Sequence, residues 1–396
     1  MKRLLSFVLI ATFLFTPAVN AAPKKISVKA MQLVTTVGTP EEVSGVVASG
    51  KSLIVYGSKA AKAYARAVDT TGKELWNLSL DQSQASIATA AVVDSVGDIW
   101  IAGATPLALG LIAPSPAVTP VNPDNAAAPP TTAVGNLQAV TLWKVTAAGV
   151  LVATNTLPTS SVVFPTAISV DRNGASIVGI IATEKSSAGF FVNADKAGLF
   201  GKLLQIGSVS TTADAVIRHA DGSFTVVGSS SEALAGKKVA GITDGVLIKI
   251  SKALKITSVV RSSAVKGKRI WNSASSTLLL GGEVVAAGKT ETAVTKFTSL
   301  FAPTWSYRFP STGPAITVGS TYAAFISTGA TAQLNWNPKV ATPLLLTFDA
   351  KGAITAGDSG PIGQKEVLGA LLSKELGLLV VTSSADTVSI FTLIPR

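Results

Sequence analysis

The sequence predicts an all-β fold, a seven-bladed β-propeller of four-stranded blades, from two observations. Short runs of Val, Ile, Leu, Thr, Phe and Tyr alternate with turn residues, and no long stretch keeps the 3.6-residue period of a helix. A strand, a tight turn and a second strand then recur at residues 43–57, 88–103, 166–180, 213–228, 270–281, 315–328 and 367–382. One unit that recurs at such intervals is typical of a propeller blade.

The turns at the centre of these units explain several acidic residues. Residues 94–97, 171–174 and 220–222 combine Asp with Gly. Asp accepts hydrogen bonds from the backbone of its own turn, and Gly adopts positive φ without steric cost. We therefore assign these aspartates to turn formation and give them no catalytic role.

Two further strands follow each unit and complete a four-stranded blade. The predicted third strands are 63–68, 140–145, 189–193, 246–250, 293–297, 344–348 and 388–393. The predicted fourth strands number only six, at 75–80, 151–156, 199–206, 256–261, 304–309 and 354–357. Because the chain ends three residues after Leu393, we expect residues 26–36 to supply the missing strand. The N-terminal strand would then complete the last blade and close the ring.

The first 21 residues have the pattern of an export signal. Lys2 and Arg3 precede the apolar run 4–15, and small residues stand at Val19 and Ala21. This predicts a signal peptide at 1–21, cleaved near Ala21, and a secreted or extracytoplasmic protein; an uncleaved anchor is the alternative. The remaining residues, 22–396, are expected to form a single propeller domain. No later run is long enough to predict a membrane span.

One interval between repeats is too long. The second strands of the second and third units end 77 residues apart, whereas the other intervals are 46 to 54 residues. The excess lies at 104–138, a segment rich in Pro, Ala and Thr. Proline cannot donate to a β-ladder, so we expect a loop insertion. A tolerated surface insertion is favoured over a flap or partner-docking segment.

Parts of the chain resemble known propeller families. Residues 88–105, and 213–229 followed by 244–250, resemble the secreted bacterial β-propeller repeat of the SBBP type. Residues 68–76 are similar to the blade motif of pyrroloquinoline-quinone-like propellers, in which the Trp docks one blade against the next; here that residue is Trp76. The turns at 147–149 and 349–352 keep only the glycine turn, and Trp305 only the aromatic ring.

These resemblances imply architecture rather than activity. Neither family pattern transfers a catalytic residue to this sequence. Quinoprotein dehydrogenases would also imply a metal and a quinone site, but the chain has no Cys and no evident acidic cluster. We therefore expect no cofactor. The other Trp residues are expected to pack between blades.

The sequence contains little catalytic chemistry. It has no Cys and one His, which excludes disulfides, thiolate zinc sites and two-His metal sites. Residues 357–361, Gly-Asp-Ser-Gly-Pro, look like the nucleophile segment of trypsin-like proteases, but His219 is predicted several blades away. Calcium loops and Gly-rich phosphate loops are absent. A non-catalytic protein is favoured. A carbohydrate-active or lyase-type enzyme with acidic residues at the ring axis is the alternative.

Basic residues are unevenly distributed along the sequence. The chain has 33 Lys and Arg against 22 Asp and Glu, and residues 236–269 hold nine basic residues and one acid, Asp244. Loops joining strands two and three, and loops between blades, emerge on one face of a propeller. The candidate binding residues expected on that loop face are Lys237, Lys238, Lys266, Lys268 and Arg269.

The predicted function is a binding scaffold. The basic loop residues would contact an anionic surface polymer or an acidic protein, and a merely solvated basic edge is the competing interpretation. Trp336, in a loop, is the best candidate for an aromatic that stacks on a sugar. Nucleic acid is not expected, because no aromatic residues are interleaved with the basic cluster. A monomer is expected.

Overall fold

The computed structural model describes residues 25–81, 85–107, 136–183 and 185–394. The predicted signal peptide at 1–21 and most of the predicted insertion at 104–138 lie outside these residues. The described part of the chain consists of strands, turns and loops. None of its segments is a helix of the length and apolar character needed to cross a membrane.

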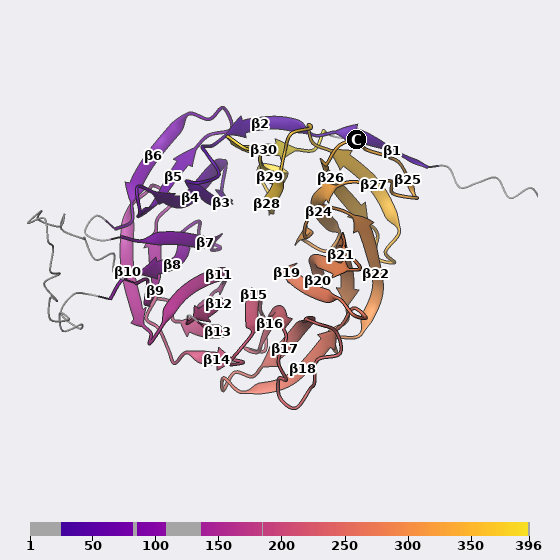
Figure 1. Ribbon diagram of the computed structural model, residues 1–396. Coiled ribbons are helices and arrows are strands. Elements are labelled where there is room, and N and C mark those ends of the chain that lie inside the picture. The colour runs from indigo at the N-terminus through magenta and orange to yellow at the C-terminus, as the bar shows by residue number, and fades with distance from the viewer. Residues whose placement is uncertain (1–24, 82–84, 108–135, 184, 395–396) are drawn as a thin grey trace, which may run out of the picture.

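Six sheets of the described chain have four antiparallel strands each, ordered from the ring centre outward (Figure 1). The first is β3 (Val43–Ser49), β4 (Ser52–Lys59), β5 (Lys62–Val68) and β6 (Glu74–Ser79). The second is β7 (Ile87–Val93), β8 (Ile99–Thr105), β9 (Ala139–Val145) and β10 (Leu151–Pro158). The third is β11 (Val162–Asp171), β12 (Gly174–Ala182), β13 (Ser187–Ala194) and β14 (Leu204–Ile206).

The remaining four-stranded sheets follow the same plan. The fourth is β15 (Thr211–Arg218), β16 (Phe224–Ser230), β17 (Asp244–Ile250) and β18 (Ile256–Ser262). The fifth is β19 (Lys268–Ala274), β20 (Leu279–Ala286), β21 (Lys289–Phe297) and β22 (Pro303–Pro310). The last is β28 (Glu366–Ser373), β29 (Gly377–Ser383), β30 (Val388–Thr392) and, from the N-terminal part of the chain, β2 (Gln32–Thr36).

One sheet is larger than the others. It begins with β23 (Ile316–Val318), β24 (Tyr322–Ser327), β26 (Thr342–Phe348) and β27 (Ile354–Ser359). Two further strands extend it at the rim: β1 (Ile26–Ala30), parallel to β27, and β25 (Leu334–Asn335), parallel to β1. The sheet therefore has six strands.

The prediction of seven four-stranded blades is wrong. The described chain is an all-β propeller with six four-stranded blades, not seven, and the six-stranded sheet stands in the ring beside them. The physical reason is the free outer edge of β27, whose unpaired backbone groups are satisfied by β1. The loop between β24 and β26 then folds back to cover β1 with β25.

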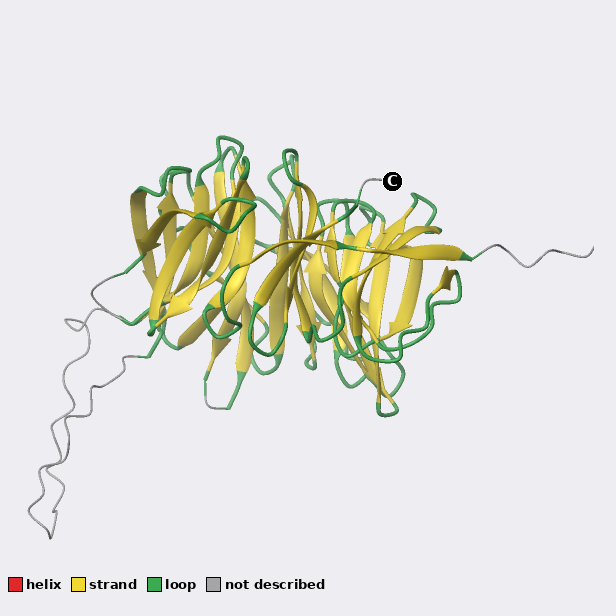
Figure 2. Ribbon diagram, turned by 90° about the horizontal axis from the view of Figure 1, so that it is seen from above, coloured by secondary structure: helices red, strands yellow, loops and turns green. Residues whose placement is uncertain are grey.

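The N-terminal segment joins the two ends of the chain. The sequence predicts one strand over residues 26–36, but the chain bends at Met31. The Met31 side chain is buried, and its backbone N–H donates a hydrogen bond to the Ser359 carbonyl. Beyond Met31, β2 pairs antiparallel with β30, as Gln32 opposite Thr392 shows. Figures 1 and 2 show β1 and β2 crossing from the six-stranded sheet to the last four-stranded blade along the outer rim.

Apolar cores lie between neighbouring blades rather than at one centre. Between the first and second blades, for example, Ile54 and Ala65 pack with Ile101 and Trp143. Between the last blade and the first, Val381 and Ile390 pack with the first blade's inner strands. Each blade therefore buries apolar side chains against both neighbours.

A side chain of the outer strand also docks on a glycine turn of the next blade. The Nε1 of Trp76 donates to the Ala147 carbonyl at 3.1 Å, and a Cβ added at Gly149, where φ is +82°, would lie 2.5 Å from the Trp76 ring. This confirms the docking role predicted for Trp76. The equivalent close pairs elsewhere are Thr35 with Gly72, Asn155 with Gly198 and Trp305 with Gly352.

We expect Gly149→Ala to destabilise the protein by at least about 2 kcal/mol, because it adds a clash with Trp76 to the strain of positive φ. Gly377→Ala is the matched control, since φ is +74° there and nothing lies within 4 Å of the added Cβ. It should cost only about 1 kcal/mol. Denaturant unfolding of both variants tests this, and equal losses would contradict docking at Gly149.

Candidate functional site

Three of the four candidate lysines lie on two adjoining loops, and the fourth begins the strand that follows. Lys237 and Lys238 are exposed in the loop between β16 and β17, and Lys266 is exposed in the loop between β18 and β19. Lys268, also exposed, is the first residue of β19. The two loops bond to each other, since the Ile242 amide donates to the Gly267 carbonyl at 2.8 Å. We call the exposed residues of 207–210, 231–243 and 263–268 the basic loop face.

Glu232 ties this face to the preceding loop. Its carboxylate accepts the backbone N–H groups of Ser208, Val209 and Ser210 at 2.9 to 3.1 Å and the Thr211 hydroxyl at 2.7 Å. Partial burial alone would raise the pKa of Glu232, but these donors outweigh it and lower the pKa to about 2. The anchor is therefore ionised at all ordinary pH values.

Asp244 and Arg261 fix the loop 231–243 as well. Asp244 is fully buried, and its carboxylate accepts the amides of Ala240 and Gly241 at 2.9 Å each. Arg261 pairs with Asp244 at 3.4 Å and donates to the Lys237 carbonyl at 3.1 Å. The Arg261 guanidinium also donates to the Glu232 carbonyl. Desolvation raises the pKa of Asp244, but the backbone donors and Arg261 lower it overall.

No carboxylate of the two loops themselves forms an ion pair with the exposed lysines, although Glu283 of the neighbouring strand β20 interacts electrostatically with Lys268. Both acidic residues of residues 231–244, Glu232 and Asp244, direct their oxygens into loop anchoring. The loops that display the positive charge are thus fixed in shape by the carboxylates that could otherwise have neutralised it. This favours attraction of an anionic partner.

Exposed apolar side chains accompany the lysines. Val209 is 59% exposed, Ile242 56% and Val265 88%. They belong to the three loops that Glu232 and the Ile242 amide link together. The sequence does not single them out, because an isolated apolar residue within a polar loop is ordinary. Only their convergence in space makes them part of one surface.

Arg269 does not belong to this surface. It was predicted in the loop between two blades, but it lies in β19 and is only 5% exposed. Its guanidinium stacks on Trp271 at 4.2 Å and donates to the Thr295 hydroxyl at 2.9 Å. Burial lowers the pKa of Arg269 to about 10, with repulsion from Arg308 adding to the effect. The apolar stem and planar head let this arginine pack between strands.

Trp336 lies apart from the lysines, on the six-stranded sheet. It is half-buried against the core of that sheet, and its Nε1 donates to the Ser327 hydroxyl at 3.1 Å. Its ring therefore supports the loop that folds back over β1. A role in sugar stacking stays a prediction.

The innermost strands share a feature that the strand pattern of the sequence does not reveal. In six of them one residue is bulged out of register with the second strand. These residues are Ser44, Thr89, Thr166, Asp214, Asn272 and Leu368, and all but the last are polar. The signal in the sequence is a polar residue followed by a small one at the same place in five of the repeats. Bulges re-aim side chains and are features in their own right.

Among these bulged residues the one carboxylate is Asp214. Its oxygen accepts the Thr212 hydroxyl at 2.6 Å. Burial raises the pKa of Asp214 to about 6, and the Thr212 hydrogen bond only partly offsets this. In the described residues no group of three His, Cys, Asp or Glu side chains converges as a metal site would require.

We expect Glu232→Gln to loosen the basic loop face without unfolding the protein, because a neutral amide accepts hydrogen bonds more weakly than a carboxylate. Amide hydrogen exchange at Ser208, Val209 and Ser210 should accelerate by about tenfold at neutral pH. Glu41→Gln, at an exposed residue on another loop, is the control. Unchanged exchange at the three amides would contradict the anchoring role.

We expect Asp214→Asn to stabilise the protein at neutral pH. With a folded-state pKa near 6, above its ordinary value, Asp214 costs stability as pH rises through 6 and costs none below about pH 4. The variant should exceed the wild type by about 1 to 3 kcal/mol at pH 7.5 and match it near pH 4. Thermal unfolding across this pH range measures the difference, and a gap independent of pH would refute the shifted pKa.

Comparison with known proteins establishes the fold alone. No protein-family model matches the sequence, and no curated protein matches it either. Solved structures match in 214 chains, among them a structural-genomics crystal structure of a protein from Lactobacillus plantarum. That chain is 11% identical, with a TM-score of 0.50, and the match covers 90% of this chain and 89% of the other. The propeller fold is thus shared, but neither the SBBP-type nor the quinone-type resemblance is supported by a family match.

Proposed function

We propose that the protein is a non-catalytic binding scaffold, exported after removal of residues 1–21, whose basic loop face contacts an anionic cell-envelope polymer or acidic protein. The observation that carries this proposal is the set of four exposed lysines on loops that their own carboxylates hold rigid. The residues that would make the contact are Lys237, Lys238, Lys266 and Lys268.

Electrostatics supports an anionic partner. Four ammonium groups on adjoining loops raise the local concentration of anions and the rate of encounter, and salt screens this attraction over roughly 10 Å. The two carboxylates of this loop region, Glu232 and Asp244, are engaged with backbone amides. They therefore compete little with a bound anion for the lysines.

Preorganisation supports binding as well. A flexible loop loses entropy when a partner orders it, whereas a loop already fixed loses little. The loop 231–243 is fixed at both ends and in the middle, by Glu232, Asp244 and Arg261. The apolar side chains of Ile242 and Val265 add contact area that a rigid, partly apolar partner could cover.

We expect the variant with Lys237, Lys238, Lys266 and Lys268 all changed to Ser to elute from a polyanionic matrix at clearly lower salt than the wild type. The physical reason is the loss of four clustered ion contacts, each of which contributes to the salt dependence of binding. The measurement is the elution salt on heparin and on a phosphorylated cellulose column.

The matched control changes four exposed lysines on the opposite face, in turns between third and fourth strands: Lys196, Lys252, Lys255 and Lys351. It alters net charge by the same amount. Elution of both variants at the same salt would mean that net charge alone governs retention, and the basic loop face would then be a solvated edge.

A further inference from the structure

The third strand of the first blade departs from the pattern of its counterparts. In β9, β17 and β26 five consecutive residues are buried, so both faces of each strand pack against neighbouring blades. In β5 burial alternates instead. Ala63, Ala65 and Ala67 are fully buried toward the second blade, while Lys62, Tyr64 and Arg66 occupy the other face. A local break in a repeated packing rule is expected at functional sites.

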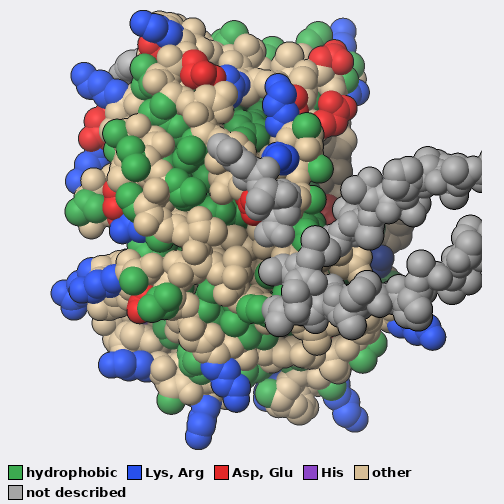
Figure 3. All heavy atoms as spheres, turned by 90° about the vertical axis from the view of Figure 1, so that its left-hand side faces the viewer, with side chains coloured by type: hydrophobic (Ala, Val, Ile, Leu, Met, Phe, Trp, Pro, Cys, Tyr) green, Lys and Arg blue, Asp and Glu red, His purple; other side chains and the backbone are tan. Residues whose placement is uncertain are grey.

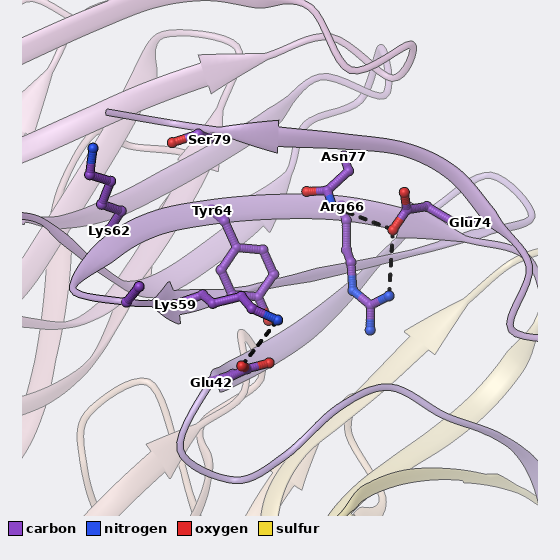
Figure 4. Close-up of a pocket in the computed structure, with 9 residues that line it drawn as sticks. Glu42, Lys59, Lys62, Tyr64, Arg66, Glu74, Asn77 and Ser79 are labelled. Carbon is purple, nitrogen blue, oxygen red and sulfur yellow. Dashed lines mark hydrogen bonds and ion pairs between the residues drawn. The ribbon is translucent and has the colours of Figure 1, made fainter. Parts of the chain in front are cut away.

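The polar face of β5 forms one wall of a cleft of about 540 Å³ (Figure 4). Register places Ser79 and Asn77 of β6 opposite Tyr64 and Arg66, so both strands present polar side chains on one surface. Lys59 and the segment before β3, with Glu42, border the other side. The volume lies within the range of small-molecule sites.

Four of the five charged groups that line the cleft form two ion pairs, and the fifth, Lys62, lies apart from them at one end of the cleft in Figure 4. The Lys59 ammonium lies 3.2 Å from the Glu42 carboxylate, and the Arg66 guanidinium lies 3.6 Å from that of Glu74. Arg66 also donates to the Val37 carbonyl at 2.8 Å. These pairs are partly exposed, so each keeps donor or acceptor capacity on the side that faces the cleft.

Tyr64 lies centrally among these pairs in Figure 4, between Glu42 and Arg66. The ring is half-buried, and burial raises the pKa of its hydroxyl, with Arg66 lowering it in part. The hydroxyl is therefore protonated at neutral pH and can both donate and accept. The ring supplies an apolar surface beside that polar group.

We infer that this cleft binds a neutral carbohydrate. Sugar hydroxyls both donate and accept hydrogen bonds, which suits a wall where Lys59, Arg66 and Asn77 donate and Glu42 and Glu74 accept. The apolar face of a sugar ring would pack on Tyr64. An anionic ligand would meet Glu42 and Glu74, and a cationic ligand would meet Lys59 and Arg66, so a ligand without charge fits the matched pairs best.

The surface around the cleft has the same mixed character. Figure 3 shows acidic and basic side chains interspersed over the upper part of that view, where the first blade lies, whereas Lys and Arg dominate the lower part. The cleft is also on the other side of the ring from β17 and β18, which flank the basic loops (Figure 1). The carbohydrate site is therefore independent of the basic loop face.

The experiment is calorimetric titration of the full chain with neutral oligosaccharides, namely fragments of β-glucan, chitin, mannan and galactan. Oligogalacturonate and chitosan fragments serve as the acidic and basic probes. We expect at least one neutral fragment to bind, and Tyr64→Ala and Asn77→Ala to weaken that binding by about tenfold or more. Tyr64→Phe should retain most of it, because the ring remains.

Two controls make the result specific. Asn335→Ala changes an exposed strand asparagine outside the cleft and should leave binding unchanged, and thermal unfolding verifies that every variant folds. The four-lysine variant of the basic loop face should also bind normally. This separates failure of the carbohydrate site from failure of the anion-binding proposal.

Three outcomes would overturn the inference. The first is the absence of binding by every neutral fragment at millimolar concentration. The second is binding that Tyr64→Ala leaves intact, which would place the sugar elsewhere on the molecule. The third is binding of only the acidic or only the basic fragments, which would show that one member of each charge pair governs recognition.

Discussion

Close approach between an outer strand and the next blade's turn is the contact on which the ring depends. A side chain of the outer strand lies over a glycine with φ between +82° and +89° in the turn that follows, at Gly72, Gly149, Gly198 and Gly352. Only glycine combines that backbone conformation with room for the neighbour. Because Thr35 of β2 makes this contact with Gly72, the N-terminal segment joins the last blade to the first in the same way as blades joined within the chain.

The sequence predicts features that are local. The turns of Asp94 and Asp171 fold as expected, since each aspartate accepts amides two residues along its own turn. Closure of the ring by the N-terminal segment was predictable, because the sequence shows seven third strands but only six fourth strands. This count requires no knowledge of which strands pair. The bend at Met31 and the parallel pairing of β1 were not, since they depend on an exposed edge more than 300 residues away.

Features that depend on residues distant in the chain could not be predicted from the sequence. Arg269 follows two lysines and so looked like a loop residue, yet Trp271 and Thr295 provide a buried place for it. The alternation of β5 is visible as Lys-Ala-Tyr-Ala-Arg-Ala, but it becomes informative only when the other third strands are known to be buried on both faces. The two proposed sites thus differ in origin. The basic loop face follows from a run of basic residues in the sequence. The cleft follows from a third strand that is buried on only one face.

The N-terminal pairing has a kinetic meaning. Gln32 lies opposite Thr392, whereas most strand pairs join residues of a single repeat. Local hairpins form early because their loop-closure entropy is small, so the individual blades can assemble before the ring does. The final step must bring together the two ends of nearly the whole chain. Until then the edges of β27 and β30 are open to strands of other molecules, and any aggregation during folding should begin at this seam.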